Sequence, residues 1–308
     1  MNSEFCINVA CSTNRLANHS RLSAVETIFS SEKMLSGGLR TRNSFKSSNE
    51  NNPLITIVTV VYNGVEFIEN TIRSVIGQKC DNVEYIIVDG ASTDGTLELI
   101  KKYDNEIDYW ISGKDSGIYD AMNKGISLST GKWVNFMNCG DTFISDTVLS
   151  EMNYILKSYN HSIVSGNVRI VSREGVFTGL KHPYAGSDYN QLLAYNCVAH
   201  QACFVSKTVY DLLDGFESGY KIHGDYEFWI RAMISSIDLI YVDKDIAFFS
   251  NDGISSNRKN VPIAIRERYY ILNKYGLMTS VGSKAYTFCS ITYYYIKTFI
   301  RFLINRKF

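Results

Sequence analysis

Two uninterrupted apolar runs constrain the fold of this chain more than any other feature. LITIVTVV (54–61) and VEYIIV (83–88) are rich in β-branched residues, as is typical of strands buried on both faces of a parallel sheet. Between them, apolar residues from Phe67 to Ile76 recur at helical spacing, and the loop DGASTDG after the second run opens another helix. Strands and helices that alternate with short loops predict an α/β fold with right-handed crossovers.

The alternation continues with less regularity through the second half of the chain. We expect a helix over Tyr119–Leu128 and a strand over 133–137. Beyond residue 160 the pattern predicts a mixed arrangement, with strands at 163–171, 202–206 and 239–249 and helices at 207–213, 225–235 and 262–275.

Composition shifts divide the 308 residues into three parts. Residues 1–52 are rich in Ser and Asn and predict a polar extension and linker, with one short helix around Leu22–Ile28. Residues 53–260 form the expected α/β domain, whose first half ends at residue 145 and whose second half begins at 146. Residues 261–308 predict a helical tail.

Charge, hydrophobicity and cysteine content exclude several classes of protein. A hydrophobic fraction of 45% excludes wholesale disorder. The 31 basic residues are balanced by 31 acidic residues, which argues against a globally basic nucleic-acid-binding protein. The seven cysteines include no C-x-x-C pair, which argues against a zinc site or a disulfide framework and favours a reducing compartment. No secretory signal is evident, and no apolar stretch approaches the roughly 20 residues that span a bilayer.

Acidic residues follow three expected strand ends. Asp89 comes directly after VEYIIV, Asp141 follows WVNFM, and Asp115 and Asp120 lie in the loop KDSGIYD. Ligands of open parallel sheets bind at the carboxyl ends of the strands, where carboxylates can contact a base, a ribose or a Mg²⁺ or Mn²⁺ ion on a diphosphate. We therefore expect these four side chains to contact a nucleotide ligand or its metal.

The alternative is that strand-end aspartates only cap the next helix or turn. This alternative is favoured for Asp94 and Asp146, since each stands just before a helical pattern. Ligand binding is favoured for Asp89 and Asp141, because each follows a buried strand.

Three segments together resemble the nucleotide-binding half of the family 2 glycosyltransferases, which have the GT-A fold. They are TIVTVVYNGVEFIENTIRSVIGQ, IIVDGASTDGT and DAMNKGISLSTGKWVNFMNCGD, and they occur in the family's order. The resemblance covers roughly residues 53–255. It implies a mostly parallel twisted sheet flanked by helices, and transfer of a sugar from a nucleotide diphosphate, usually with inversion and a divalent metal.

The resemblance assigns residues to the donor side of the site. In the family the end of the first strand lies along the nucleotide base, and the matching residues here are Thr59, Val61, Tyr62 and Asn63. Asp89 matches the acid that contacts the base, and Gly90 stands where the family often has a second acid. The run from Asn138 to Asp141 aligns with the metal-binding D-x-D-type motif. It leaves Asp141 as the charged metal ligand and places Asn138 beside the nucleotide sugar.

HGDYEFWIRA (223–232) supplies the expected catalytic base. Asp225 occupies the position of the catalytic Asp in the family's E-D motif, where Gly224 replaces the usual Glu. Inverting transfer needs one carboxylate to accept the proton of the acceptor hydroxyl, with no covalent intermediate. Glu227 is a possible second acid. The alternative for both is that they are first-turn helix acids favoured by the helix dipole.

The same resemblance places His200, Gln201 and Trp229 in the pocket between donor and acceptor. A lone histidine is more often a structural residue, so this assignment has a plausible alternative. NDGISS (251–256) is similar to a family loop that closes over the diphosphate, and an ordinary turn is an equally good interpretation.

The tail carries no acidic residue after Glu267. A helix over 284–305 would gather Phe and Tyr side chains on one face, with Lys297 and Arg301 roughly opposite. Such a helix suits an anionic membrane surface, and packing against the domain is an equally good alternative.

GGLRTRNSF, together with DSGIYDAMNKG, resembles the subgroup that builds O-antigen or capsule repeat units. That resemblance implies a membrane-associated enzyme at the cytoplasmic face of a bacterial inner membrane. Its expected reaction is β-1,3 transfer of glucose from UDP-glucose to GlcNAc-diphospho-undecaprenol. UDP-Gal, UDP-GlcNAc and GDP-sugar donors remain alternatives.

Two other functions remain open at this point. At Gly90, Asn138 and Gly140 this chain lacks acidic residues of the family pattern, as a non-catalytic sugar-nucleotide or glycan-binding scaffold would. The presence of Asp141 and Asp225 argues against such a scaffold. A nucleotidyltransferase would need a Gly-rich, cationic loop after the first strand, and the loop at Tyr62 is too short and uncharged.

Overall fold

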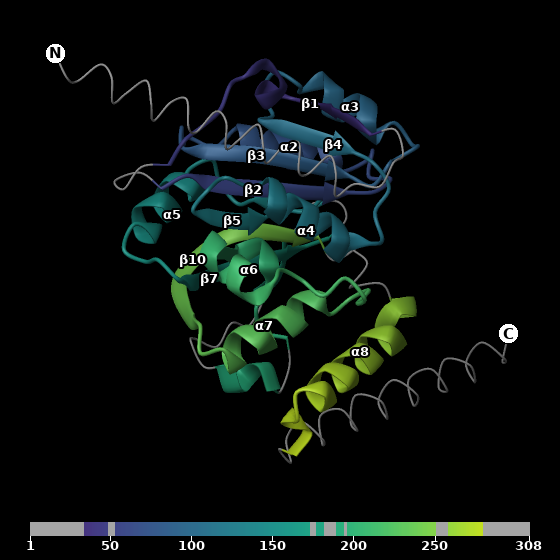
Figure 1. The fold of residues 1–308 in the computed structure, drawn as a ribbon, viewed down its shortest axis with the longest axis vertical. Helices are drawn as coiled ribbons and strands as arrows, with labels where there is room; N and C mark the ends of the chain where they lie inside the picture. Colours follow the sequence, from purple (N-terminus) through teal and green to yellow (C-terminus); the bar gives the residue numbers. More distant parts are fainter. Residues whose placement is uncertain are drawn as a thin grey trace, which may run out of the picture.

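The computed structural model describes residues 34–48, 53–172, 177–181, 189–193, 196–250 and 258–279. In these ranges ten strands form one sheet (Figure 1), in the order β1-β4-β3-β2-β5-β9-β7-β10-β6, with β8 paired to β7. The strands are β1 Leu35–Gly37, β2 Ile55–Val61, β3 Val83–Asp89, β4 Tyr109–Ser112, β5 Trp133–Phe136, β6 Thr142–Phe143, β7 Ser162–Val171, β8 Phe177–Lys181, β9 Cys203–Ser206 and β10 Asp238–Ser250.

Helices connect and cover these strands. The α-helices are α2 Ile68–Ile76, α3 Thr96–Lys102, α4 Ile118–Leu128, α5 Val148–Leu156, α6 Lys207–Leu213, α7 Gly224–Ile234 and α8 Val261–Lys274. Short 3-10 turns are η1 Leu39–Arg42, η2 Tyr189–Leu193, η3 His200–Ala202, η4 Arg258–Asn260 and η5 Leu277–Thr279.

The first half of the sheet is parallel and the second half is mixed. β2 pairs in parallel with β3 and β5, and β3 pairs in parallel with β4. Every residue of β2 and β3 is buried, as the two apolar runs predict. β9 reverses the direction, since it is antiparallel to both β5 and β7, whereas β7 and β10 are parallel. The α/β fold expected from the sequence is confirmed.

Helices cover both faces of the sheet and divide the core into two clusters. α2, α3 and α5 pack on one face, where Ile68, Ile100 and Leu149 are fully buried. α4, α6, α7 and α8 pack on the other face, with α4 over β2 and β3 and α8 beside α7 (Figure 1). The strand ends therefore emerge between two helical layers, and this arrangement positions the site.

Residues 35–42 correct the expectation of a polar extension up to residue 52. β1 pairs antiparallel with β4, so this segment is an edge of the sheet. Arg40 is 5% exposed and forms an ion pair with Glu84, which also accepts hydrogen bonds from Thr56 Oγ1 at 2.6 Å and Thr130 N at 2.8 Å. A three-residue strand has no periodicity to detect, and the buried partner of Arg40 lies 44 residues away.

The tail is described only at its start. α8 agrees closely with the helix expected at 262–275. The expected short helix at 22–28, the loop 251–256 and the amphipathic segment 284–305 lie outside the described residues. Within the described ranges, no helix combines the length and the apolar character needed to cross a bilayer.

Candidate active site

The turn from Asn138 to Asp141 lies at the carboxyl end of β5. Gly140 has a φ of 101°, a left-handed conformation that favours glycine, and no atom lies within 4 Å of the position of an added Cβ. Thr71 of α2 holds the turn, because its Oγ1 donates to the Asp141 carbonyl at 2.9 Å and accepts from Gly140 N at 3.1 Å. The fixed turn aims Asp141 and Asn138 into the space beside β10.

Asp141 carries a buried carboxyl group with few partners. Its side chain hydrogen-bonds Gln201 and accepts from Ser250 N at 3.4 Å. Burial raises the pKa of Asp141 to about 6, and the neighbouring His200 and Gln201 limit the rise. Because burial destabilises the charged form of this carboxyl group, a nearby cation would stabilise that form strongly.

These residues fit a divalent cation held mainly by substrate. The Oδ1 of Asn138 is buried and has no hydrogen-bond partner among the described residues, so it is a second oxygen of the kind that Mg²⁺ prefers. In the described part of the chain, no three His, Cys, Asp or Glu side chains gather into a metal cage. Asp141 and Asn138 would therefore share a cation with diphosphate oxygens and water.

A chain of hydrogen bonds connects this turn to Asp225. Asn138 Nδ2 lies 3.0 Å from His200 Nε2, and His200 Nδ1 lies 3.5 Å from Asp225 Oδ2. Asp225 also accepts from Tyr226 N at 2.7 Å and is 9% exposed. Burial alone would raise the pKa of Asp225, but the hydrogen bond and charge of His200 hold it below its usual value. A carboxylate at this position can act as a proton acceptor.

Tyr119 of α4 is a residue of this site that the sequence analysis missed. Its hydroxyl donates to the Ile222 carbonyl at 2.7 Å and lies 3.5 Å from Asp225 Oδ1. A Cβ at Gly224 would lie 2.7 Å from the Tyr119 ring. The space that a glutamate would need at position 224 is therefore filled by this ring. Its place inside the segment DSGIYD is the only sequence signal for Tyr119.

Gly90 shows the same kind of replacement on the donor side. A Cβ at this position would lie 2.6 Å from Asp115 Oδ2 and 3.3 Å from the ring of Tyr62. The carboxylate of Asp115 thus occupies the position expected for a second acid after β3. Burial raises the pKa of Asp115, and the charges of Asp120 and Asp89 add to the rise. The absent acid at position 90 does not leave the site without a carboxylate.

Asp89 is more enclosed than expected for a residue that contacts a base. It is fully buried and accepts hydrogen bonds from Ser112 Oγ at 2.6 Å and from both Ser92 N, at 3.1 Å, and Ser92 Oγ. Tyr62, in contrast, is 67% exposed. The exposed Tyr62 ring and the Asp115 carboxylate therefore form the accessible surface at this strand end.

Hydrogen bonds and an ion pair fix the side chains of Asn63 and Asp120, the other predicted donor residues. Asn63 has a φ of 50° and its Oδ1 accepts from Thr93 N at 2.9 Å. Asp120 accepts from Ser116 N at 2.9 Å and pairs with Lys124 at 3.1 Å. Asn63 and Asp120 thus shape the loops on either side of the Tyr62 ring.

The structure corrects three assigned ligand contacts. The Thr59 hydroxyl is buried and donates to the Met137 carbonyl at 2.7 Å, and Val61 is a core residue. Trp229 is 1% exposed and packs in the core against Phe228, at 5.2 Å between ring centroids. Thr59 and Val61 lie in β2, where every residue is buried, and Trp229 is buried within α7, so these three side chains have no surface for a ligand.

Glu227 lies apart from Asp225, although both begin the same helix. Its carboxylate is wholly buried and accepts from Arg231 Nε at 2.9 Å and from the hydroxyl of Tyr275. Two residues along a helix turn the side chain to a different face. Glu227 therefore anchors α7 to α8, and the assignment as a second acid is corrected.

Comparisons with known proteins identify the family and the fold. Residues 56–209, half of the chain, match the family model described as "Glycosyl transferase family 2". A glycosyltransferase of PGL/p-HBAD biosynthesis from Mycobacterium bovis is 26% identical over 67% of this chain and 80% of its own length. An uncharacterised glycosyltransferase from Haemophilus influenzae is also 26% identical, over 75% of this chain and 93% of its own.

Solved structures show the same fold. Residues 1–349 of S. aureus TarS, in complex with UDP-GlcNAc, match 71% of this chain with a TM-score of 0.56 and 14% identity. This chain spans 66% of that TarS chain, slightly less than two thirds of it. The mannosyltransferase PcManGT from Pyrobaculum calidifontis, in complex with GDP-Man and Mn²⁺, matches 87% of this chain and 74% of its own, with a TM-score of 0.54 and 14% identity.

The sheet with its parallel first half and these matches lead to one conclusion. The chain is a glycosyltransferase of GT-A-like fold, and it belongs to glycosyl transferase family 2.

Proposed function

We propose that this enzyme transfers a hexose with inversion and uses Asp225 as the catalytic base. One observation carries the proposal. In its support, hydrogen bonds from Asn138 to His200 and from His200 to Asp225 connect the Asp141 turn to the carboxylate proposed as the base. A nucleotide-sugar diphosphate at that turn would present its sugar toward Asp225.

The proposed reaction is a single displacement. An acceptor hydroxyl attacks the anomeric carbon, a new carbon–oxygen bond forms there, and its proton passes to Asp225 Oδ2. The bond from the anomeric carbon to the diphosphate breaks on the opposite face, and the nucleoside diphosphate leaves with the bonding electrons. When bound at Asp141 and Asn138, a Mg²⁺ or Mn²⁺ ion would neutralise charge on the leaving diphosphate. His200 holds the Asp225 carboxylate in position.

For the donor we propose UDP-glucose, and for the acceptor a lipid-linked saccharide such as GlcNAc-diphospho-undecaprenol, in a β-1,3 linkage. Support comes from the motif resemblance to enzymes of O-antigen and capsule assembly. Structural neighbours have been solved in complex with UDP-GlcNAc and with GDP-Man. UDP-Gal, UDP-GlcNAc and GDP-sugars are the competing donors.

We further propose that the enzyme works at the cytoplasmic face of a bacterial inner membrane. The sequence after Glu267 supports this, because it is basic and aromatic without an acidic residue. A polar face rich in Lys and Arg is attracted to anionic lipid headgroups.

The reaction is tested with the full chain, a panel of UDP- and GDP-sugars and a synthetic GlcNAc-diphospho-lipid, with and without EDTA. Product mass identifies the sugar, and the NMR coupling constant of the anomeric proton identifies the anomer. We expect a β-linked hexose product that EDTA diminishes. An α-linked product from these donors would contradict inversion, and no turnover of any donor would contradict the proposal as a whole.

The membrane proposal has a separate test. A variant that ends after Gly276 should co-sediment less with vesicles of anionic phospholipid than the full chain does. Equal co-sedimentation of the two would overturn the proposal, and vesicles of neutral phospholipid provide the control.

A further inference from the structure

The loop that precedes Asp225 is held by α8, a helix outside the half of the chain that matches the family. The carboxylate of Glu267 on α8 accepts three successive backbone amides, from Lys221 N at 2.6 Å, Ile222 N at 2.9 Å and His223 N at 2.9 Å. The side chain of His223 also hydrogen-bonds the Ala264 backbone of α8. A charged acceptor that satisfies three amides fixes the path of a loop more strongly than neutral hydrogen bonds would.

The same loop sets the surroundings of the base. The carbonyl of Ile222 accepts the hydroxyl of Tyr119, whose ring covers Gly224. The carbonyl of His223 accepts Glu227 N at 2.9 Å, so the first turn of α7 begins at the clamped loop. Displacement of residues 221–223 would therefore move both Tyr119 and the helix turn that carries Asp225.

We propose that Glu267 is a positioning residue for the catalytic base, which acts by holding residues 221–223 against α8. This inference rests on the proposed role of Asp225. Glu267 lies on a different element from every residue assigned to the site, and it touches neither the Asp141 turn nor the Tyr62 end of the donor side. Its loss should reduce the rate of transfer and leave nucleotide binding unchanged.

Neighbouring contacts between the loop and α8 provide a matched control. Glu217, 45% exposed, pairs with Lys274 of α8. Glu217→Gln removes an ion pair between the same two segments without touching the amides of residues 221–223. If any weakening between the loop and α8 were enough to lower the rate, this control would lower it as well.

The test compares Glu267→Gln, Glu267→Ala, Glu267→Asp and Glu217→Gln in the full chain. Hydrogen exchange at the amides of 221–223 should accelerate by about tenfold or more in Glu267→Ala, with exchange in β2 and β3 unchanged. Donor turnover should fall roughly 10- to 100-fold in Glu267→Ala and less in Glu267→Gln, which keeps one acceptor oxygen. The donor KM and the Kd for UDP should stay within about twofold of the wild-type values, and Glu267→Asp should recover part of the rate.

The rate and exchange measurements test the positioning role of Glu267 and its contact with residues 221–223 separately. A wild-type rate in Glu267→Gln together with faster exchange would overturn the positioning role, and so would a loss of rate matched by an equal loss in Glu217→Gln. Unchanged exchange in both Gln and Ala variants would overturn the clamp itself. If the wild-type enzyme turned over no donor, the proposed function would fail, while the exchange measurements would still test the clamp.

Discussion

The donor side and the base side of the active site are held in place by contacts that connect different parts of the chain. On the donor side, Asp89 accepts hydrogen bonds from Ser92 and Ser112, 3 and 23 residues further along. Asn63 accepts from Thr93, 30 residues further along. On the base side, Asp225 contacts His200, 25 residues earlier, and Tyr119, 106 residues earlier. The donor-side contacts therefore stay within the parallel half of the sheet and its loops, whereas the contacts of Asp225 reach back from α7 to α4.

This difference predicts that substitutions on the two sides will affect different kinetic constants. Donor-side variants should alter nucleotide affinity, and base-side variants should alter the rate of transfer. The variants below test that separation.

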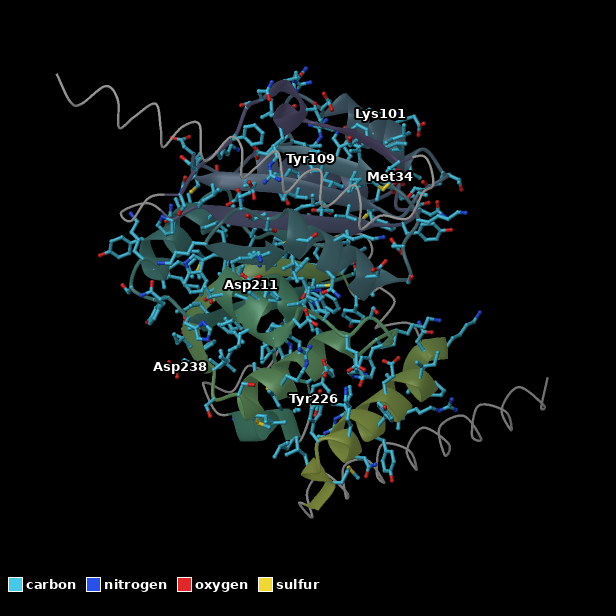
Figure 2. All side chains as sticks on the ribbon, viewed as in Figure 1. Met34, Lys101, Tyr109, Asp211, Tyr226 and Asp238 are labelled. Atoms are coloured by element: carbon cyan, nitrogen blue, oxygen red, sulfur yellow. The ribbon has the colours of Figure 1, made fainter. Side chains whose placement is uncertain are left out.

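Asp225→Asn should have the largest effect. Removal of the base should lower kcat by about 10³-fold and leave the Kd for UDP unchanged, as measured by turnover assays and calorimetry. Asp211→Asn, at an exposed residue of α6 that Figure 2 labels, is the control and should behave as wild type. Full activity of Asp225→Asn would disprove its role as base.

Asp141→Asn should have the next largest effect, and it should act through the metal. We expect turnover to fall on the order of 100-fold and binding of Mn²⁺ in the presence of UDP to weaken, as followed by paramagnetic resonance. In EDTA, UDP should bind the variant and the wild type equally. Unaltered Mn²⁺ binding would remove Asp141 from the metal site.

Glu227→Gln should affect stability instead of chemistry. Loss of one charge from the buried contact with Arg231 should lower the free energy of unfolding by about 3 kcal/mol, measured by urea denaturation. The folded fraction should keep kcat within about threefold of wild type. A variant of native stability with a large loss of kcat would restore Glu227 as a second catalytic acid.

Asp115→Asn should have the smallest effect and should fall on the donor side. The loss of a charged acceptor beside Tyr62 should weaken UDP binding about fivefold with little change in kcat. Asp146→Asn, a surface change at the pair with Lys79, is the control. Equal UDP affinity in wild type and Asp115→Asn would show that Asp115 only shapes its loop.

Sequence patterns could predict the parallel half of the fold because its strands are buried on both faces. In β2 and β3 most residues are apolar, so each strand can be predicted from its own residues. β4, only four residues long, carried no such signal. α5 begins just after Asp146, where a helical pattern was expected, and Val148, Leu149, Met152 and Leu156 form its buried face at helical spacing.

The residues of the candidate site also differ in how far the sequence could predict them. Asp141 and Asp225 belong to local motifs, so the sequence alone could offer them as candidates, whereas it could not show that Asp89 is fully buried. The contacts of Tyr119 and Glu267 depend on elements that meet only in the folded chain, so a single sequence holds no spacing that would reveal them. Thr59 was misassigned because strand-end position says nothing about which way a side chain points.

The strand β1 and its buried Arg40 have a practical consequence for any shortened form of the enzyme. A fragment that begins at Pro53, where the sequence pattern changes, would leave β4 as an open edge able to pair with another molecule. It would also leave the carboxylate of Glu84 in the interior without its cation. Such a fragment should aggregate or be digested by proteases, whereas one that begins before Met34 keeps β4 paired with the short edge strand β1.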